Sequence, residues 1–146
     1  MMKKLRRKPK SHWLLTRLSS TYYEERKYSK ALALCKRAVK LAPVCPLALW
    51  DYACTLDMTG NCKKAIAIWK KLLRRGADAV AYNECGEGLR WARSLLNDCK
   101  YRIGIAYRKM GNRRLATSFL RKHCEGRSPS IPSIYKLSLV KRELKN

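Results

Sequence analysis

The sequence predicts an all-α protein that folds as a right-handed solenoid of helix-turn-helix repeats. Ala, Leu, Lys and Arg dominate its 146 residues, with only seven Gly and five Pro, a composition typical of helices. Apolar residues recur at spacings of three and four, as on the buried face of an α-helix. The pattern returns with a constant period of 34 residues, which indicates helix pairs that bury their apolar faces by stacking.

The first repeat covers about residues 12–45 and the second about 46–79. Each is predicted to hold two antiparallel helices. Pro43 closes the apolar run of the first repeat, and Gly76 ends that of the second. Pairs of side chains that lie 34 residues apart should occupy equivalent environments: Leu15 and Leu49, Leu18 and Tyr52, Tyr22 and Leu56, Ala31 and Ala65, Cys35 and Trp69.

A third repeat is predicted over about residues 97–130, after an insertion over 80–96. Apolar spacings of three and four run from Leu89 to Met110 and predict one long helix across the boundary between the two. This helix extends the first helix of the third repeat backward by two turns.

The two ends of the chain differ from the repeats. A capping helix with a polar outer side is predicted over about residues 132–145, with Ile134, Leu137 and Val140 (or Leu144) on one face. Residues 1–10 contain six basic residues and no apolar period, so they predict a flexible arm. The domain itself is expected to cover residues 11–146.

The repeats resemble the tetratricopeptide repeat (TPR) family, and the chain is similar to small uncharacterised bacterial TPR proteins. The family pattern is carried in the first repeat by Leu15, Leu18, Ser19, Tyr22, Ala31, Cys35, Ala38 and Pro43, and in the second by Leu49, Tyr52, Ala53, Leu56, Gly60, Ala65, Trp69 and Leu72. The third repeat matches at Ile103, Gly104, Tyr107, Gly111, Ala116 and Leu120. Arg26 departs from the family pattern because it stands where the helix-breaking Gly is expected.

The resemblance implies a non-catalytic scaffold or adaptor that binds a protein segment in a concave groove, lined by the first helix of each repeat. Carried onto this sequence, the groove residues are Trp13, Arg17, Ser20, Tyr23, Glu24, Trp50, Asp51, Cys54, Asp57, Asp98, Tyr101 and Arg102. The alternative is that some of these, above all Trp13 and Trp50, pack against the insertion helix or the arm.

Acidic residues are concentrated among these groove positions. Four of the ten acidic residues in the chain are there: Glu24, Asp51, Asp57 and Asp98. The groove therefore predicts a basic or mixed-charge partner, and the basic arm of the chain itself is one candidate. Chaperone-binding TPR proteins hold a C-terminal carboxylate with five polar or basic groove residues. Only Arg102 is retained here, so no binding of an acidic chaperone tail is expected.

The rest of the chain is strongly basic, with 34 Lys and Arg and a net charge of +24. The second helices of the repeats place basic pairs on the outer face, in a stripe of Lys36, Arg37, Lys70, Lys71, Arg121 and Lys122. One interpretation is a solvated surface that became basic by compositional drift. The alternative function is a basic protein that associates with RNA or the ribosome, binding nucleic acid without sequence specificity through this stripe and the arm.

Other chemistries find little support in the residues. The sequence has no GxxxxGK[ST], GxGxxG, GxSxG or HExxH motif, so neither catalysis nor a cofactor is expected. Cys85, Cys99, His123 and Cys124 lack metal-ligand spacing, and no metal site is predicted. The seven cysteines include no CxxC pair and suggest a reducing compartment. With no predicted signal peptide or membrane insertion, the expected location is the cytoplasm.

Overall fold

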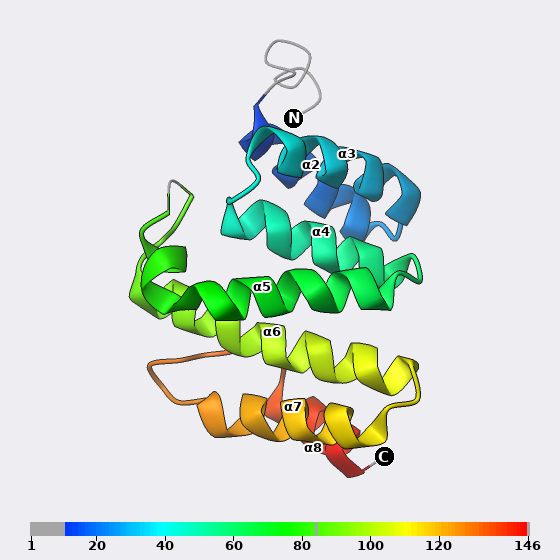
Figure 1. Cartoon of the computed structure of the whole chain (residues 1–146), viewed down its shortest axis with the longest axis vertical. Coiled ribbons are helices and arrows are strands. Elements are labelled where there is room, and N and C mark those ends of the chain that lie inside the picture. Colours follow the sequence, from blue (N-terminus) through cyan, green and yellow to red (C-terminus); the bar gives the residue numbers. More distant parts are fainter. Residues whose placement is uncertain (1–10, 84, 146) are drawn as a thin grey trace.

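The computed structural model describes residues 11–83 and 85–145, which fold into seven helices stacked along the long axis of the molecule (Figure 1). The residues predicted as a flexible arm lie outside this part. The helices are α2 (His12–Glu24), α3 (Tyr28–Leu41), α4 (Pro46–Met58), α5 (Cys62–Ala81), α6 (Leu89–Lys109), α7 (Arg113–Gly126) and α8 (Leu137–Lys145). The predicted all-α solenoid is confirmed.

Each of the three helix pairs turns in the same way, because one residue between the helices has a positive φ. That residue is Gly60 in the second pair (φ 91°) and Gly111 in the third (φ 82°). In the first pair Arg26 takes this conformation at φ 60°, at the position where the repeat pattern expects glycine. A side chain is disfavoured there, so the turn of the first pair carries backbone strain that the other two avoid.

The helices approach one another closely where the repeats carry small residues. Ala31, Ala65 and Ala116 are each at most 2% exposed. At Gly104 an added Cβ would lie 2.8 Å from the side chain of Leu120, so only glycine fits between α6 and α7 without a shift. Side chains that lie 34 residues apart are buried to a similar degree between the helices. Leu15 and Leu49, and likewise Cys35 and Trp69, are all at most 4% exposed.

The insertion continues α5 beyond the end predicted at Gly76. Gly76 (φ 80°, ψ 169°) interrupts the helical geometry, and one more turn follows as far as Ala81. The backbone then loops back, with Gly88 N donating to Ala81 O at 3.3 Å, and α6 begins at Leu89. The resulting α6 is the long helix that the apolar spacing predicts.

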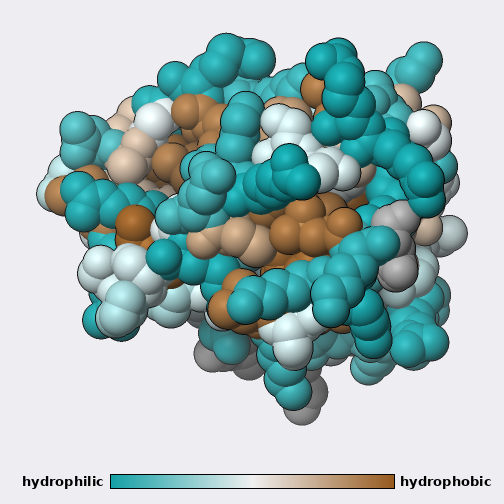
Figure 2. All heavy atoms as spheres, turned by 90° about the horizontal axis from the view of Figure 1, so that it is seen from below, coloured by the Kyte–Doolittle hydropathy of each residue, from teal (hydrophilic) through white to brown (hydrophobic). Residues whose placement is uncertain are grey.

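The C-terminal segment differs from its prediction. Helix α8 begins at Leu137 rather than near residue 132, because Asp98 of α6 holds the backbone of Ile134 in a non-helical segment. The expected apolar face is also divided: Val140 is fully buried, whereas Ile134 is 76% exposed. Seen along the axis from the end that carries α7 and α8, apolar side chains gather in the middle of this face, with hydrophilic ones around them (Figure 2).

Candidate functional site

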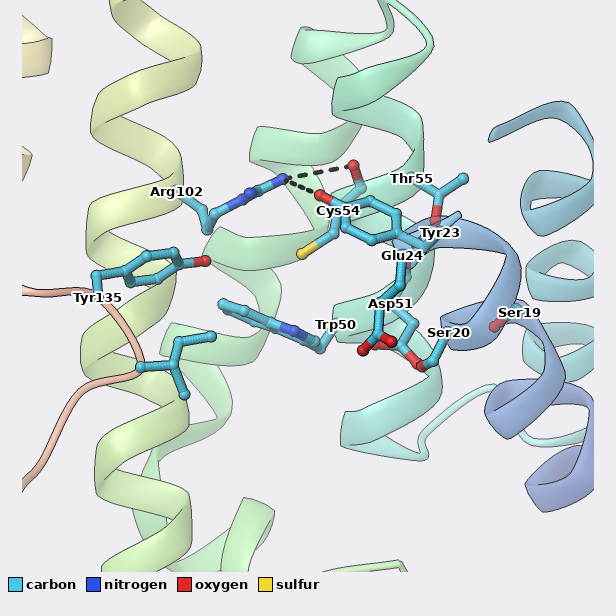
Figure 3. A pocket seen from close by; sticks show the side chains of 11 residues that line it. Ser19, Ser20, Tyr23, Glu24, Trp50, Asp51, Cys54, Thr55, Arg102 and Tyr135 are labelled. Carbon is cyan, nitrogen blue, oxygen red and sulfur yellow. Dashed lines mark hydrogen bonds between the residues drawn. The ribbon is translucent and has the colours of Figure 1, made fainter. Parts of the chain in front are cut away.

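A hollow of about 320 Å³ opens on the side of the stack formed by the first helices of the repeats (Figure 3). Its volume lies at the lower end of the range usual for ligand pockets, enough for one or two side chains of an extended segment. Its lining consists of Ser19, Ser20, Tyr23 and Glu24 from α2, Trp50, Asp51, Cys54 and Thr55 from α4, Arg102 from α6, and Ile134 and Tyr135 from the C-terminal segment.

Seven of the twelve predicted groove residues line this hollow: Ser20, Tyr23, Glu24, Trp50, Asp51, Cys54 and Arg102. Trp50 also packs inward, with its ring 6.4 Å from that of Trp69. Trp50 therefore belongs to the core and also borders the hollow. Because Trp69 lies on α5, this contact is not the packing against the insertion helix or the arm that the alternative expects, and that alternative stays a prediction.

The carboxylate of Asp51 is the main acidic group of the hollow. Ser20 Oγ donates a hydrogen bond to Asp51 Oδ2 at 2.9 Å, and no ion pair reaches Asp51 from residues 11–83 or 85–145. Burial raises the pKa of Asp51 to about 6, because the charged form loses solvation, and the Ser20 hydrogen bond offsets only part of this. Glu24 adds an exposed carboxylate at the rim.

The positive charge of Arg102 is directed at residues of the protein itself. Its Nη2 donates to Asp57 Oδ2 at 3.4 Å and to Tyr23 Oη at 3.4 Å, and its guanidinium lies 5.4 Å from the Trp69 ring centre. Asp57 is buried and also pairs with Lys109 at 3.0 Å. Asp57 is therefore shared between Arg102 and Lys109, and it does not line the hollow, although its position predicted a groove residue.

Asp98 and Tyr101 were predicted to line the groove, but the chain itself covers both. Ser133 Oγ donates to Asp98 Oδ1, and the backbone N–H of Ile134 donates to Asp98 Oδ2 at 3.2 Å. Tyr135 stacks on Tyr101 with ring centres 4.0 Å apart. The segment over residues 131–136 thus lies across the part of the groove that the third repeat would provide.

Two further predicted groove residues lie elsewhere. The Arg17 guanidinium is 4.8 Å from the ring centre of Trp13, and both side chains are exposed. Trp13 lines a second hollow, together with His12, Thr16, Cys45, Leu47, Cys85, Gly86 and Glu87.

Four residues of the first hollow were missed by the sequence analysis. Ser19 was assigned to packing, Thr55 was not singled out, and Ile134 and Tyr135 belong to a segment expected to be helical. Ser19 and Thr55 are buried, although both also line the hollow. No local signal places residues 134 and 135 here, because their position depends on Asp98, 36 residues earlier in the chain.

The basic stripe on the second helices is exposed at Lys36, Arg37, Lys71, Arg121 and Lys122. Lys70 differs, because its Nζ donates to Tyr107 Oη at 2.6 Å and lies 5.7 Å from the Phe119 ring centre. Lys70 is therefore half-buried between α5, α6 and α7. The part of the chain that the structure describes has no helix that combines the length and apolar character needed to cross a membrane.

Comparison with known proteins adds evidence on the fold. No family model matches the chain, and no curated protein matches it by sequence. Among solved structures, the N-terminal domain of stress-induced protein-1 (STI-1) from C. elegans is 16% identical and superposes with a TM-score of 0.63, covering 90% of this chain and 93% of that one. The chain has a TPR-like fold.

Two other solved structures resemble the TPR-like chain less. MamA is 21% identical, with a TM-score of 0.47 and coverage of 86% of this chain and 83% of that one. YrrB, described as a TPR protein with an unusual peptide-binding site, is 14% identical, with a TM-score of 0.47 and coverage of 99% and 97%.

Proposed function

We propose that this TPR-like protein is a non-catalytic scaffold that binds an extended protein segment in the hollow between α2, α4 and α6, through a Lys or Arg side chain of that segment. The observation that carries the proposal is the pairing of charges. Arg102 is paired with Asp57, whereas Asp51 faces the hollow and, among the residues that the structure describes, has only the neutral hydroxyl of Ser20 as the hydrogen-bond partner of its carboxylate.

The surroundings of Asp51 suit a cationic side chain. Trp50 and Tyr135 provide apolar walls for its methylene groups, and Glu24 adds a second carboxylate at the rim. A cation placed beside Asp51 would also favour its ionised form, so binding and deprotonation of Asp51 are coupled. The affinity should therefore rise as the pH increases through about 6.

The same residues disfavour a C-terminal carboxylate as the ligand. Of the five positions that bind carboxylates in chaperone-binding TPR proteins, Thr16 is buried and Ser20 is bonded to Asp51. Asp98 is bonded to the C-terminal segment and Arg102 to Asp57. Arg102 is thus the one cation among these groups, and it is already paired with Asp57.

A second candidate function, binding of a polyanion such as RNA, is favoured by a shallow basic hollow on α7. Its lining consists of Arg113, Arg114, Thr117, Ser118, Arg121, Lys122 and Glu125. Six phosphate contacts would give a salt slope of about −5 and roughly a thousandfold loss of affinity between 50 and 200 mM salt. A weaker salt dependence would argue against this second function.

Fluorescent peptides that differ only in Lys/Arg or Glu content test the first proposal. The Lys/Arg peptide should bind, and Asp51→Asn should weaken binding about ten- to a hundredfold, as expected for loss of a charge-assisted hydrogen bond. A matched control, Lys36→Glu with Lys71→Glu on the outer face, should leave peptide binding unchanged. Preferential binding of the Glu peptide, or equal binding by Asp51→Asn, would contradict the proposal.

A further inference from the structure

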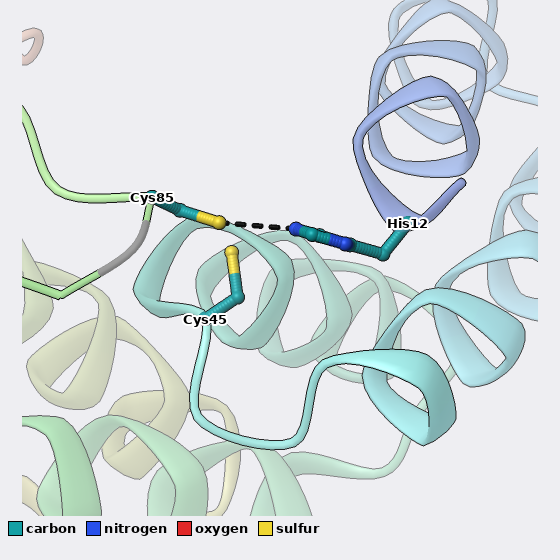
Figure 4. A group of neighbouring side chains, drawn as sticks. All are labelled: His12, Cys45 and Cys85. Atoms are coloured by element: carbon teal, nitrogen blue, oxygen red, sulfur yellow. Dashed lines mark hydrogen bonds between the residues drawn. The ribbon is translucent and has the colours of Figure 1, made fainter.

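Three side chains with ligand atoms for a soft metal meet in the second hollow, from segments far apart in the chain (Figure 4). His12 is the first residue of α2, Cys45 precedes α4 as its N-cap, and Cys85 lies in the loop between α5 and α6. Their ligand atoms all lie within 4.8 Å of one another, and His12 Nε2 is 3.0 Å from Cys85 Sγ.

These separations are close to those of a tetrahedral zinc site. Bonds of about 2.3 Å to sulfur and about 2.0–2.1 Å to nitrogen place neighbouring ligand atoms roughly 3.6–3.8 Å apart. The His12–Cys85 separation of 3.0 Å lies below this value and the upper bound of 4.8 Å on the other separations lies above it, so shifts of up to about one ångström would seat an ion. Cys45 is buried, whereas His12 and Cys85 are half-buried, which leaves the ion a path from solvent.

We infer that His12, Cys45 and Cys85 bind one Zn²⁺ ion, with the fourth position taken by the Glu87 carboxylate, which lines the same hollow, or by solvent. Imidazole and thiolate ligands select zinc over Mg²⁺ and Ca²⁺, which prefer oxygen. Binding converts two thiols to thiolates and releases their protons to solvent. The two thiolates balance the charge of the ion, so this very basic chain gains no further positive charge there.

This site shares no lining residue with the hollow proposed to bind protein segments. Its ligands would connect the start of the first helix pair, the turn into the second and the loop that precedes the third. An ion held by all three segments restrains the loop around residue 85 against the first repeat. Because the ion binds the folded chain, it also raises the temperature of unfolding.

The experiment uses the full reduced chain and Co²⁺, which reports thiolate ligation by a charge-transfer band and tetrahedral geometry by strong visible absorption. We expect one Co²⁺ per chain, displaced by Zn²⁺, with release of protons. His12→Ala and Cys85→Ser should weaken binding at least about a hundredfold, more than the loss of outer-shell partners typically costs. Cys62→Ser and Cys124→Ser, matched half-buried controls outside the cluster, should bind Co²⁺ as the wild type does.

Four outcomes would overturn the inference. The reduced wild-type chain could show no thiolate-to-cobalt band, the control variants could lose the band as fully as Cys85→Ser, or His12→Ala and Cys85→Ser could both bind normally. If the only reaction of Cys45 with Cys85 is a disulfide formed in air, the cluster is a redox pair and not a metal site. Far-ultraviolet circular dichroism of each variant separates loss of ligation from loss of fold. His12 and Cys85 are half-buried, so their variants carry the test without a substitution at the buried Cys45.

Discussion

The first helices of the second and third repeats each present an aromatic residue followed by a charged residue to the same side of the stack, but these residues meet different partners. Trp50 and Asp51 on α4 correspond to Tyr101 and Arg102 on α6 in the repeat pattern. Asp51 faces the hollow, whereas Tyr101 is covered by Tyr135 and Arg102 is paired with Asp57.

The covering of Tyr101 arises from the segment that follows the third repeat in the chain. After the second repeat the chain continues into α6, which stacks beside α5. After the third repeat, residues 131–136 return across the groove and are held by Asp98. Position in the repeat therefore determines which way a side chain points, but the last segment of the chain determines whether that side chain is accessible.

The largest effect is expected from Asp98→Ala, which removes the acceptor that holds this segment. Ser133 Oγ and the N–H of Ile134 would lose their partner, so the free energy of unfolding should fall by about 2–4 kcal/mol. Hydrogen exchange should accelerate in residues 131–145 and remain slow in α4 and α5. Asp78→Ala, on α5 and away from this segment, is the control, and uniform acceleration along the chain would refute the anchoring role.

Tyr135→Ala should uncover the third repeat while leaving Asp98 in place. Loss of a half-buried ring stacked at 4.0 Å on Tyr101 should cost about 2–3 kcal/mol in chemical denaturation. The hollow should also widen, so that peptides with bulkier residues beside the cation bind better relative to small ones. An unchanged preference would show that Tyr135 does not limit the hollow.

Asp51→Asn should change how stability depends on pH. The pKa of Asp51 is raised from 3.8 to about 6 in the folded chain, so folding favours the protonated form. Stability therefore falls as pH rises from about 4 to 6, and the cost persists at higher pH. The variant should remove this slope and be more stable at pH 7 by about 1–3 kcal/mol, measured by denaturation at several pH values. Glu25→Gln, which is exposed, should retain the slope.

Arg26→Gly tests the turn that distinguishes the first repeat from the other two. Glycine adopts φ 60° without the clash of a side chain, so the variant should be more stable by about 1 kcal/mol. Lys27→Gly is the control, because its N–H closes the same turn while its φ is negative at −90°. A loss of stability in Arg26→Gly would show that the Arg26 side chain matters more than its backbone conformation.

The smallest effect is expected from Arg108→Ala, which breaks the ion pair between α6 and Glu143 of α8. Both side chains are partly exposed, so solvent screens the pair and the loss should not exceed about 1 kcal/mol. It should also decrease as salt is added. A larger or salt-independent loss would mean that α8 is held mainly by this pair and not by Val140.

The sequence predicted a helix well where the helix is defined by apolar residues that recur along one of its faces. The long α6 follows from the spacing between Leu89 and Met110, and the turns at Gly60 and Gly111 follow from the repeat pattern. The start of α8 was misplaced by about five residues, because Asp98 competes with helix formation for the N–H of Ile134. Asp98 lies outside residues 128–136, so the sequence of that segment alone does not predict this effect.

By itself, the sequence determined the helix pairs, their 34-residue period and the side of each helix that is buried, because these depend on neighbours three and four positions away. Only the tertiary structure decided that Asp51 faces a hollow while Asp57 and Asp98 do not, and that His12, Cys45 and Cys85 meet. Those outcomes depend on which distant segments come into contact. The residues near a side chain in the sequence do not indicate which distant residue will pair with it or cover it.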